Sequence, residues 1–137
     1  MKSSPTLQKY NKKRKFSNTP EPVGQVTRLK TGSKVFTVQK HRASHLHYDF
    51  RLEDETGVLK SWAVPKGPSV DPQIKRLAVL VEDHPYDYLL FEGTIPKGNY
   101  GAGTVIVWDH GTYTTEGTLL EQFENGKISI ELQGQKR

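Results

Sequence analysis

From residue 34 onward, hydrophobic and polar residues alternate in short segments, and clusters of glycine and proline separate these segments. Alternation with a period of two is typical of strands that bury one face. The pattern predicts strands at 34–40, 45–52, 58–64, 76–82, 88–92, 103–108, 112–115 and 127–133. The last of these is the clearest, since Ile128, Ile130 and Leu132 alternate with polar residues.

The connections between these segments add one turn and one helix. Asp109-His110-Gly111 has the composition of a hairpin turn. Leu119, Leu120 and Phe123 have helical spacing ahead of a glycine, which predicts a short helix with a glycine cap. Eight short strands with almost no helix predict an all-β fold, either an antiparallel sandwich or a small antiparallel β-barrel that is closed or partly closed. A chain of 137 residues has room for one such core.

Residues 1–22 differ from the rest in composition, because they are polar and basic and end in Thr19-Pro20-Glu21-Pro22. Six basic residues against one acid in this segment account for the whole formal charge of +5. A basic arm on a neutral body suits a polyanion, since each phosphate contact releases counterions. The alternative is a solvated terminus without a partner. We therefore expect a basic, partly disordered arm at 1–22 and a barrel domain at 23–137.

Composition also excludes several kinds of chemistry. The chain has no cysteine, so disulfides, thiolate nucleophiles and cysteine-type zinc sites are excluded, and any metal must be held by histidine and carboxylate. No apolar run approaches the length of a membrane span or of a signal-peptide core. We therefore expect a cytoplasmic protein without a membrane partner.

Residues 41–52 contain the highest concentration of candidate functional side chains, and from residue 45 polar residues at odd positions alternate there with apolar residues at even positions. His45, His47, Asp49 and Arg51 share one face of the predicted strand, and apolar residues share the other. Two imidazoles and a carboxylate on one face suit Mn²⁺, Fe²⁺ or Zn²⁺. The arginine, about 6 to 7 Å beyond the carboxylate by the strand rise, can clamp a phosphate. The alternative is a polar solvent face that is rich in histidine.

Two further segments are candidates for function. Residues 82–88, Glu-Asp-His-Pro-Tyr-Asp-Tyr, follow an apolar run, and the loops at strand ends often carry functional residues. His84 is a candidate phosphate ligand or general acid and Tyr88 a candidate hydrogen-bond donor, although a histidine before proline is also typical of turns. Residues 98–103 match neither the dinucleotide nor the Walker pattern, and we interpret them as a tight turn.

These residues resemble the 3'-phosphoesterase domain of bacterial ligase D and its stand-alone bacterial and archaeal relatives. Five blocks in the same order carry the resemblance: Phe36-Thr37-Val38-Gln39-Lys40-His41, His47-Tyr48-Asp49-Phe50-Arg51-Leu52-Glu53, Lys60-Ser61-Trp62-Ala63-Val64-Pro65-Lys66-Gly67-Pro68, Val81-Glu82-Asp83-His84-Pro85 and Tyr100-Gly101-Ala102-Gly103-Thr104-Val105. The resemblance implies a small β-barrel enzyme, active with Mn²⁺. Such an enzyme removes a 3'-terminal ribonucleotide and then the remaining 3'-phosphate, and leaves a 3'-hydroxyl.

The resemblance also implies roles for particular residues. The family's metal ligands fall on His41, His47 and Asp49, so His41 replaces His45 and must reach the metal around the Ala43-Ser44 bend. The family's phosphate contacts fall on Arg51, His84 and Tyr88. Positions that support the site or the substrate fall on Gln39, Lys66, Arg76 and Glu82, and two arm positions match at Arg14 and Glu21.

The chain departs from the family in its arm, where Lys15 replaces an acid that is usual in relatives, and relatives usually continue beyond residue 134 into one more strand. The partners implied are DNA and RNA/DNA 3' ends, with the DNA ligase, polymerase and Ku of non-homologous end joining. We expect a monomer associated with the nucleoid. Two alternatives are a cupin-like metal oxygenase, for which His110 in a turn is a poor further ligand, and a non-catalytic nucleic-acid-binding barrel.

Overall fold

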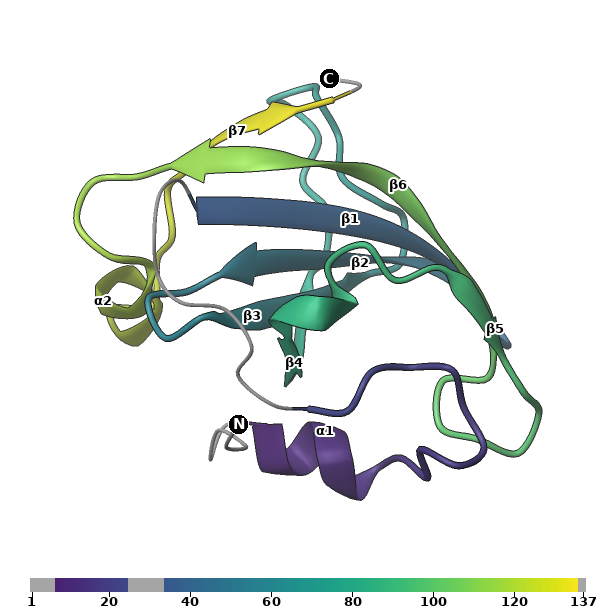
Figure 1. Cartoon of the computed structure of the whole chain (residues 1–137). Helices are drawn as coiled ribbons and strands as arrows, with labels where there is room; N and C mark the ends of the chain where they lie inside the picture. The colour runs from purple at the N-terminus through teal and green to yellow at the C-terminus, as the bar shows by residue number, and fades with distance from the viewer. Residues whose placement is uncertain (1–6, 25–33, 136–137) are drawn as a thin grey trace.

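The computed structural model describes residues 7–24 and 34–135. Within these ranges seven strands form one sheet in the order β4-β3-β2-β1-β6-β5, and β7 pairs with β6. The strands are β1 (Lys34–Arg42), β2 (Leu46–Glu53), β3 (Val58–Val64), β4 (Val79–Pro85), β5 (Gly93–Ile95), β6 (Gly103–Thr114) and β7 (Glu131–Gly134). All pairs are antiparallel, and the sheet curls into a half-barrel (Figure 1).

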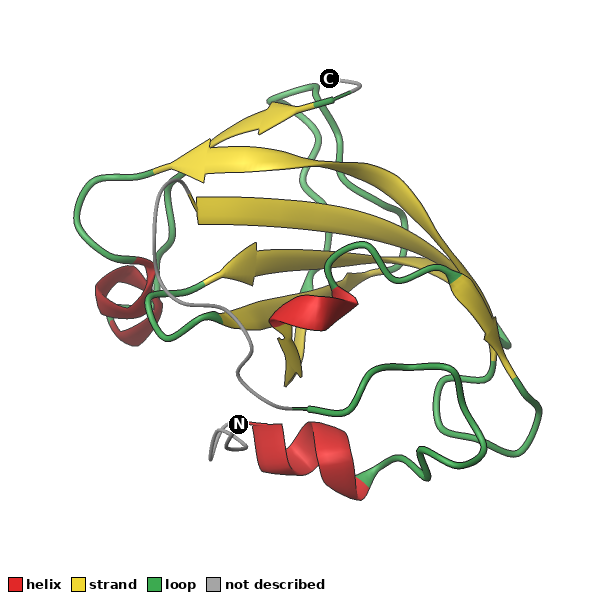
Figure 2. Cartoon of the chain, in the orientation of Figure 1, coloured by secondary structure: helices red, strands yellow, loops and turns green. Residues whose placement is uncertain are grey.

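The helices in the described ranges are short, among them α1 (Gln8–Lys12), the 3-10 turn η2 (Tyr86–Tyr88) and α2 (Leu119–Glu124) (Figure 2). The predicted all-β, partly closed barrel is therefore confirmed. The short helix before Asn125-Gly126 is confirmed as α2, and the Thr118 side chain caps it by accepting a hydrogen bond from the Glu121 amide at 3.1 Å. No helix in the described ranges is long and apolar enough to cross a membrane.

The central hairpin of β1 and β2 has two unlike faces. Phe50 and Leu52 of β2 join a hydrophobic core with Phe36 and Val38 of β1 and with Tyr113. The polar residues that alternate with them lie on the other face, where Gln39 donates to the Tyr88 carbonyl of η2 and Arg51 shares a pocket with Tyr88. Figure 1 shows η2 and α1 on the concave side of the sheet. The parity predicted for residues 45–52 therefore holds for His47, Asp49 and Arg51, whose face lies inside the curl, but not for His45, which lies in the bend before β2.

Residues 7–24 pack across the concave side of the sheet. Leu7 and Tyr10 are completely buried, and the Tyr10 ring contacts the rings of His84 and Tyr88 at centroid distances of 5.0 and 5.9 Å. In Figure 1, α1 and the segment that follows it run beside β4 and below η2. The division of the chain at residue 22 stays a prediction, but residues 7–24 contribute to the core.

The hairpin turn predicted at Asp109-His110-Gly111 is wrong, because these residues lie inside one continuous strand, β6. The predicted strands at 103–108 and 112–115 are parts of that strand. Its pairing with β1 shifts by one residue between Val38 and Gln39, which marks a bulge at this point. Gly111 serves close packing rather than a turn: a Cβ there would lie 1.9 Å from the Gln133 carbonyl oxygen.

Two other strand predictions need correction. Residues 88–92 do not form a strand; η2 closes with a hydrogen bond from the Leu89 amide to the Tyr86 carbonyl at 2.9 Å, and β5 begins at Gly93. Consecutive burial of Tyr88 and Leu89 fits a helical turn and not a strand, which would alternate. At 127–133, regular pairing is confined to β7, although Ile128 and Ile130 pack against the core as their spacing predicted.

Candidate active site

A pocket of about 290 Å³ lies on the concave face of the sheet. Its walls come from β1, β2, β3, β4 and η2, from residues 95–101, and from the arm. The lining residues are Arg14, Glu21, His41, Ala43, His47, Asp49, Arg51, Ala63, Val81, Glu82, His84, Tyr88, Ile95, Tyr100 and Gly101. The polar members include two connected groups on β1 and β2, and a set of ion pairs that involves the arm.

The first group is His41, His47 and Asp49, whose ligand atoms all lie within 4.8 Å of one another. His41 and His47 are direct cross-strand partners of β1 and β2, which puts their ring centroids 4.7 Å apart. Asp49 Oδ2 lies 3.4 Å from His41 Nδ1, and Asp49 Oδ1 lies 3.2 Å from His47 Nε2. The hairpin turn at 43–45 therefore returns the chain so that His41 reaches the same point as the two β2 residues.

Hydrogen bonds fix which ring nitrogens face this point. His41 Nε2 donates to the Gly101 carbonyl at 2.7 Å, and His47 Nδ1 donates to the His45 carbonyl at 3.2 Å. His41 Nδ1 and His47 Nε2 therefore turn toward Asp49. A ligand histidine in metalloproteins commonly donates its other nitrogen in this way, which sets the tautomer. The donor set of two imidazoles and one carboxylate fits a divalent cation of intermediate hardness.

The charges of this group reinforce one another. Burial opposes ionisation of Asp49, but hydrogen bonds from His41 and His47 and the charge of Arg51 hold its pKa well below the usual range. The hydrogen bond to Asp49 in turn raises the pKa of His47, against a smaller effect of burial. Asp49 is thus a carboxylate throughout the physiological range, as a metal ligand must be.

The second group is built around Arg51, which is only 3% exposed. Its Nε donates to Gln39 Oε1 at 2.7 Å, and Gln39 is itself held by donating to the carbonyls of Tyr88 and Phe91 at 2.8 and 3.1 Å. Arg51 Nη2 lies 3.5 Å from Asp49 Oδ2. Arg51 Nη1 is buried without a hydrogen-bond partner among the described residues. An unmet charged donor in a pocket wall calls for an anionic oxygen.

His84 faces the same pocket as a neutral imidazole. Its Nδ1 donates to the Glu82 carbonyl at 2.9 Å, and burial together with the charges of Arg51 and Arg14 lowers its pKa well below 6.5. The remaining nitrogen, Nε2, lies 3.5 Å from Arg14 Nη2. His84 therefore presents a proton acceptor in the resting site, whereas the sequence left its proton state open.

The arm closes the pocket through ion pairs. Arg14 Nε lies 3.0 Å from Glu21 Oε2 and Arg14 Nη1 lies 3.5 Å from Glu82 Oε2. Lys13 Nζ lies 3.1 Å from Glu82 Oε1, and the Tyr88 hydroxyl donates to Glu21 Oε2 at 2.5 Å. The carboxylates of Glu21 and Glu82 therefore join the arm to β4 and η2.

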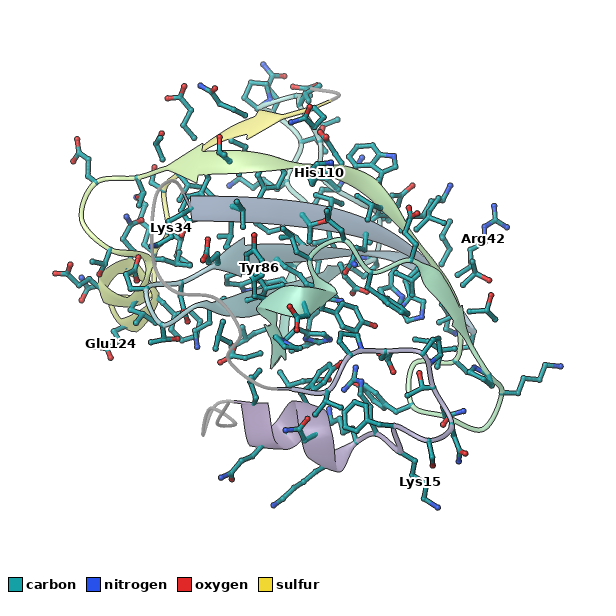
Figure 3. The ribbon with its side chains drawn as sticks, viewed as in Figure 1. Lys15, Lys34, Arg42, Tyr86, His110 and Glu124 are labelled. Atoms are coloured by element: carbon teal, nitrogen blue, oxygen red, sulfur yellow. The ribbon has the colours of Figure 1, made fainter. Side chains whose placement is uncertain are left out.

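The structure brings most of the predicted site residues together. Nine of them line the pocket, namely Arg14, Glu21, His41, His47, Asp49, Arg51, Glu82, His84 and Tyr88, and Gln39 lies behind Arg51. Lys66, Arg76 and His45 are exposed and do not line it. His110, named for the cupin-like alternative, lies in β6 and not in a turn (Figure 3). The metal-binding group found among the described residues does not include it.

Sequence reasoning missed Tyr10, Tyr100 and Gly101 at this site. Tyr10 looked like part of a polar arm, although one aromatic residue inside a basic run is a signal of burial. The tight turn inferred at 98–103 holds for its backbone, since Gly101 has a φ of +74°. Gly101 also supplies the carbonyl that orients His41, and Tyr100 forms part of the pocket mouth.

The proteins that are similar to this chain point to the same kind of site as its geometry does. Residues 39–137 match the family model described as the DNA ligase D 3'-phosphoesterase domain. The chain is 58% identical over 137 residues to a multifunctional non-homologous end joining protein LigD of Pseudomonas aeruginosa, covering 99% of this chain and 16% of that protein. The proteins of the same name from Mycobacterium bovis and Mycolicibacterium smegmatis are 44% and 45% identical over 128 and 136 residues.

These two matches cover 93% and 95% of this chain, and 17% and 18% of the respective relatives. The chain thus spans about a sixth of the length of the curated relatives it matches. The family model covers more than half of the chain and includes every predicted metal and phosphate ligand, from His41 to Tyr88. The chain therefore belongs to the DNA ligase D 3'-phosphoesterase domain family.

Proposed function

We propose that this chain is a Mn²⁺-dependent phosphoesterase that heals 3' ends during non-homologous end joining. It removes a 3'-terminal ribonucleotide and then the 3'-phosphate, and it leaves a 3'-hydroxyl. One observation supports this proposal above the others: the unpartnered Arg51 Nη1 shares a pocket with His41, His47 and Asp49. A guanidinium beside a cation-binding group is the arrangement that a phosphate ester requires.

His41, His47 and Asp49 would hold the metal, because their free ring nitrogens and carboxylate oxygens converge. Mn²⁺ is the ion that the family implies, and it accepts this mixed nitrogen and oxygen donor set. When bound, such a cation supplies Lewis-acid polarisation of a phosphate oxygen. The protein's own part is to keep Asp49 ionised and both imidazoles in the ligating tautomer.

Arg51 binds a non-bridging oxygen of the phosphate through its guanidinium, where Nε is engaged by Gln39 and Nη2 lies beside Asp49, while Nη1 has no partner among the described residues. The fixed guanidinium therefore meets developing charge without reorganising. In the monoester step His84, a neutral imidazole in the pocket wall, accepts a proton from the attacking water and gives it to the 3' oxygen as the bond from phosphorus to that oxygen breaks. In the diester step a vicinal 2'-hydroxyl takes part. Tyr88 donates to the phosphate if its hydroxyl leaves Glu21.

One assay tests the proposal. The protein is incubated with a primer–template that carries a 3'-terminal ribonucleotide or a 3'-phosphate, with Mn²⁺ and with metal removed by a chelator. We expect conversion of both ends to a 3'-hydroxyl with Mn²⁺, detected by extension of the product with a polymerase. Failure to convert either end with any divalent metal would leave a nucleic-acid-binding module as the better account.

The cellular setting is part of the same proposal. The curated relatives are non-homologous end joining proteins, so the partners we propose are DNA and RNA/DNA 3' ends, a DNA ligase, a polymerase and Ku. We propose that the chain acts as a monomer in the nucleoid-associated cytoplasm. Release of a 3'-hydroxyl is what such a ligase or polymerase requires.

A further inference from the structure

We infer that Tyr100 is a stacking platform for a nucleobase next to the scissile phosphate, an inference that rests on the proposed function. Tyr100 lies in the loop between β5 and β6, and the proposed chemistry gives its side chain no role. Its ring forms part of the wall of the phosphate pocket, yet 47% of the residue remains exposed. An aromatic ring that borders both the pocket and solvent can contact the group attached to a bound phosphate.

The exposure of Tyr100 is unusual because of where it occurs. A single exposed aromatic residue on a protein surface needs no explanation, but this one adjoins a pocket lined by Arg14, Asp49 and Arg51. Arg51, and a cation held by His41, His47 and Asp49, would bind the phosphate and leave the base without a partner. Stacking on an aromatic side chain binds any of the four bases, which suits an enzyme that must accept ends of every sequence.

Two cations of the arm hold the ring in place. Lys13 Nζ lies 3.3 Å from the Tyr100 hydroxyl and 4.6 Å from the ring centroid. Arg14 Cζ lies 5.4 Å from the same centroid. Lys13 is in turn fixed by Glu82 at 3.1 Å. The ring is thus oriented before a base arrives, which lowers the entropy cost of stacking.

The loop also ties the platform to the metal-binding group. Gly101 follows Tyr100 directly, and its carbonyl accepts the hydrogen bond from His41 Nε2 at 2.7 Å. A single peptide unit therefore sets the distance between the stacking ring and one predicted metal ligand. A base on Tyr100 would be placed in a constant relation to the phosphate beside Asp49 and Arg51.

The first test is a binding experiment without divalent metal. 2-Aminopurine, whose fluorescence falls when it stacks, is placed either in the 3'-terminal ribonucleoside of a primer or in the nucleotide before it. We expect binding to quench at least one of the two probes. Tyr100→Leu should remove most of that quenching and weaken binding about tenfold, whereas Tyr100→Phe should retain most of both. Ile106→Ala changes a residue of similar exposure, 46%, outside the pocket, and serves as control.

The position of the quenched probe tells whether the base lies on the leaving side or on the retained side of the phosphate. The inference is overturned if neither probe is quenched, or if Tyr100→Leu quenches as the unmodified chain does. Because this measurement needs no turnover, it is independent of the proposed activity. A chain that quenches the probe but converts no primer would disprove the proposed function and leave the stacking site standing.

A kinetic arm separates stacking from a purely structural role of the loop. Two primers are compared with Mn²⁺, one with a base at the probe position and one with an abasic sugar there. Tyr100→Leu should raise KM for the primer with a base about tenfold more than it raises KM for the abasic primer. A fall of kcat that is equal for both primers would mean that Tyr100 acts only by positioning His41, which would overturn the inference.

Discussion

The pocket is built from two halves that are held in different ways. The strand half consists of Gln39, His41, His47, Asp49 and Arg51 on β1 and β2. The arm half consists of Lys13, Arg14 and Glu21. The ladder of β1 and β2 fixes the strand half, because Gln39 pairs with Asp49 and His41 with His47. Side-chain contacts attach the arm half, through the ion pairs of Lys13, Arg14 and Glu21 and through the packing of the buried Tyr10.

The difference has an energetic side. The side chains of Arg14 and Glu21 are only 5% and 1% exposed, so their ion pair is buried. Removing one partner of a buried pair costs about 3 to 5 kcal/mol, because the other charge is left without compensation. The strand half can lose a side chain and keep its backbone pairing, whereas the arm half would lose part of what attaches it to the sheet.

The largest effect should follow from breaking the strand half at Asp49. Asp49→Asn keeps the shape of the side chain and removes the charge that His41, His47 and Arg51 share. We expect both the ribonucleotide and the phosphate steps to fall by at least about a thousandfold, since a bound cation contributes several kcal/mol. Initial rates with Mn²⁺, and Mn²⁺ binding by calorimetry, measure the change.

Asp71→Asn is the matched control, because Asp71 is exposed and lies outside the pocket. It should behave as the unmodified chain does. Unchanged Mn²⁺-dependent turnover in a folded Asp49→Asn protein would disprove the metal assignment.

The next effect tests whether the strand half needs geometry as well as charge. Arg51→Lys keeps a positive charge but loses the fork that joins Gln39, Asp49 and the free Nη1. We expect kcat to fall on the order of 10²–10³-fold, the typical loss for one preorganised donor. The thermal midpoint should fall little by comparison. If lysine supports normal kcat, Arg51 contributes only its charge, and the orienting role of Gln39 is wrong.

Glu21→Gln breaks the arm half. It removes the charge opposite Arg14 and changes the group that accepts from the Tyr88 hydroxyl. We expect a loss of about tenfold to a hundredfold in activity, smaller than that of Asp49→Asn, together with faster hydrogen exchange at residues 8–12. Faster exchange would show that the arm detaches. If activity falls and exchange stays slow, Glu21 acts within the chemistry and the two halves do not differ in the way proposed.

The sequence predicts the strand half of the pocket better than the arm half. Parity placed His47, Asp49 and Arg51 on one face, because strand geometry makes alternation reliable. It could not supply His41, since cross-strand register depends on a turn that alternation does not encode; only the family resemblance did. The burial of Tyr10 escaped prediction because a short helix in a basic segment has too few residues to show periodicity, and Arg14 was predicted only through the family resemblance. The turn at Gly111 was mistaken because glycine there serves close strand packing.

His84 lies where the two halves meet, so its titration measures both. The charges of Arg51 and Arg14 add to burial in lowering its pKa. Below about pH 6.5, His84 is protonated in the unfolded chain but stays neutral in the folded chain. The free energy of unfolding is therefore highest above that pH and decreases as the pH falls. We expect His84→Gln to lose less unfolding free energy between pH 7 and 5 than the unmodified chain, by up to about 2 kcal/mol.

Urea unfolding at pH 7, 6 and 5 measures this difference. The raised pKa of His47 acts in the opposite direction, but it is present in both proteins and largely cancels. Asp49 does not interfere, since its depressed pKa affects stability only at lower pH. Equal pH dependence in the two proteins would mean that His84 is not buried as a neutral group.

The smallest effect concerns the outer surface of the arm, which touches neither half of the pocket. Lys12 and Lys15 are exposed, and Figure 3 shows Lys15 pointing away from the ribbon. Lys12→Gln/Lys15→Gln should weaken DNA binding by about tenfold or less. It should also reduce the slope of log affinity against log salt by about 1 to 2, because each phosphate that loses its lysine contact keeps its counterions on binding. Lys34→Gln/Lys127→Gln removes the same charge elsewhere on the molecule and should leave the slope as it was. Hydrolysis of a small chromogenic phosphate diester, if the protein accepts one, should be the same in both double variants. If the arm variant loses that reaction as well, the outer lysines support the pocket. Lys12 and Lys15 would then belong to the active site together with Lys13, Arg14 and Glu21.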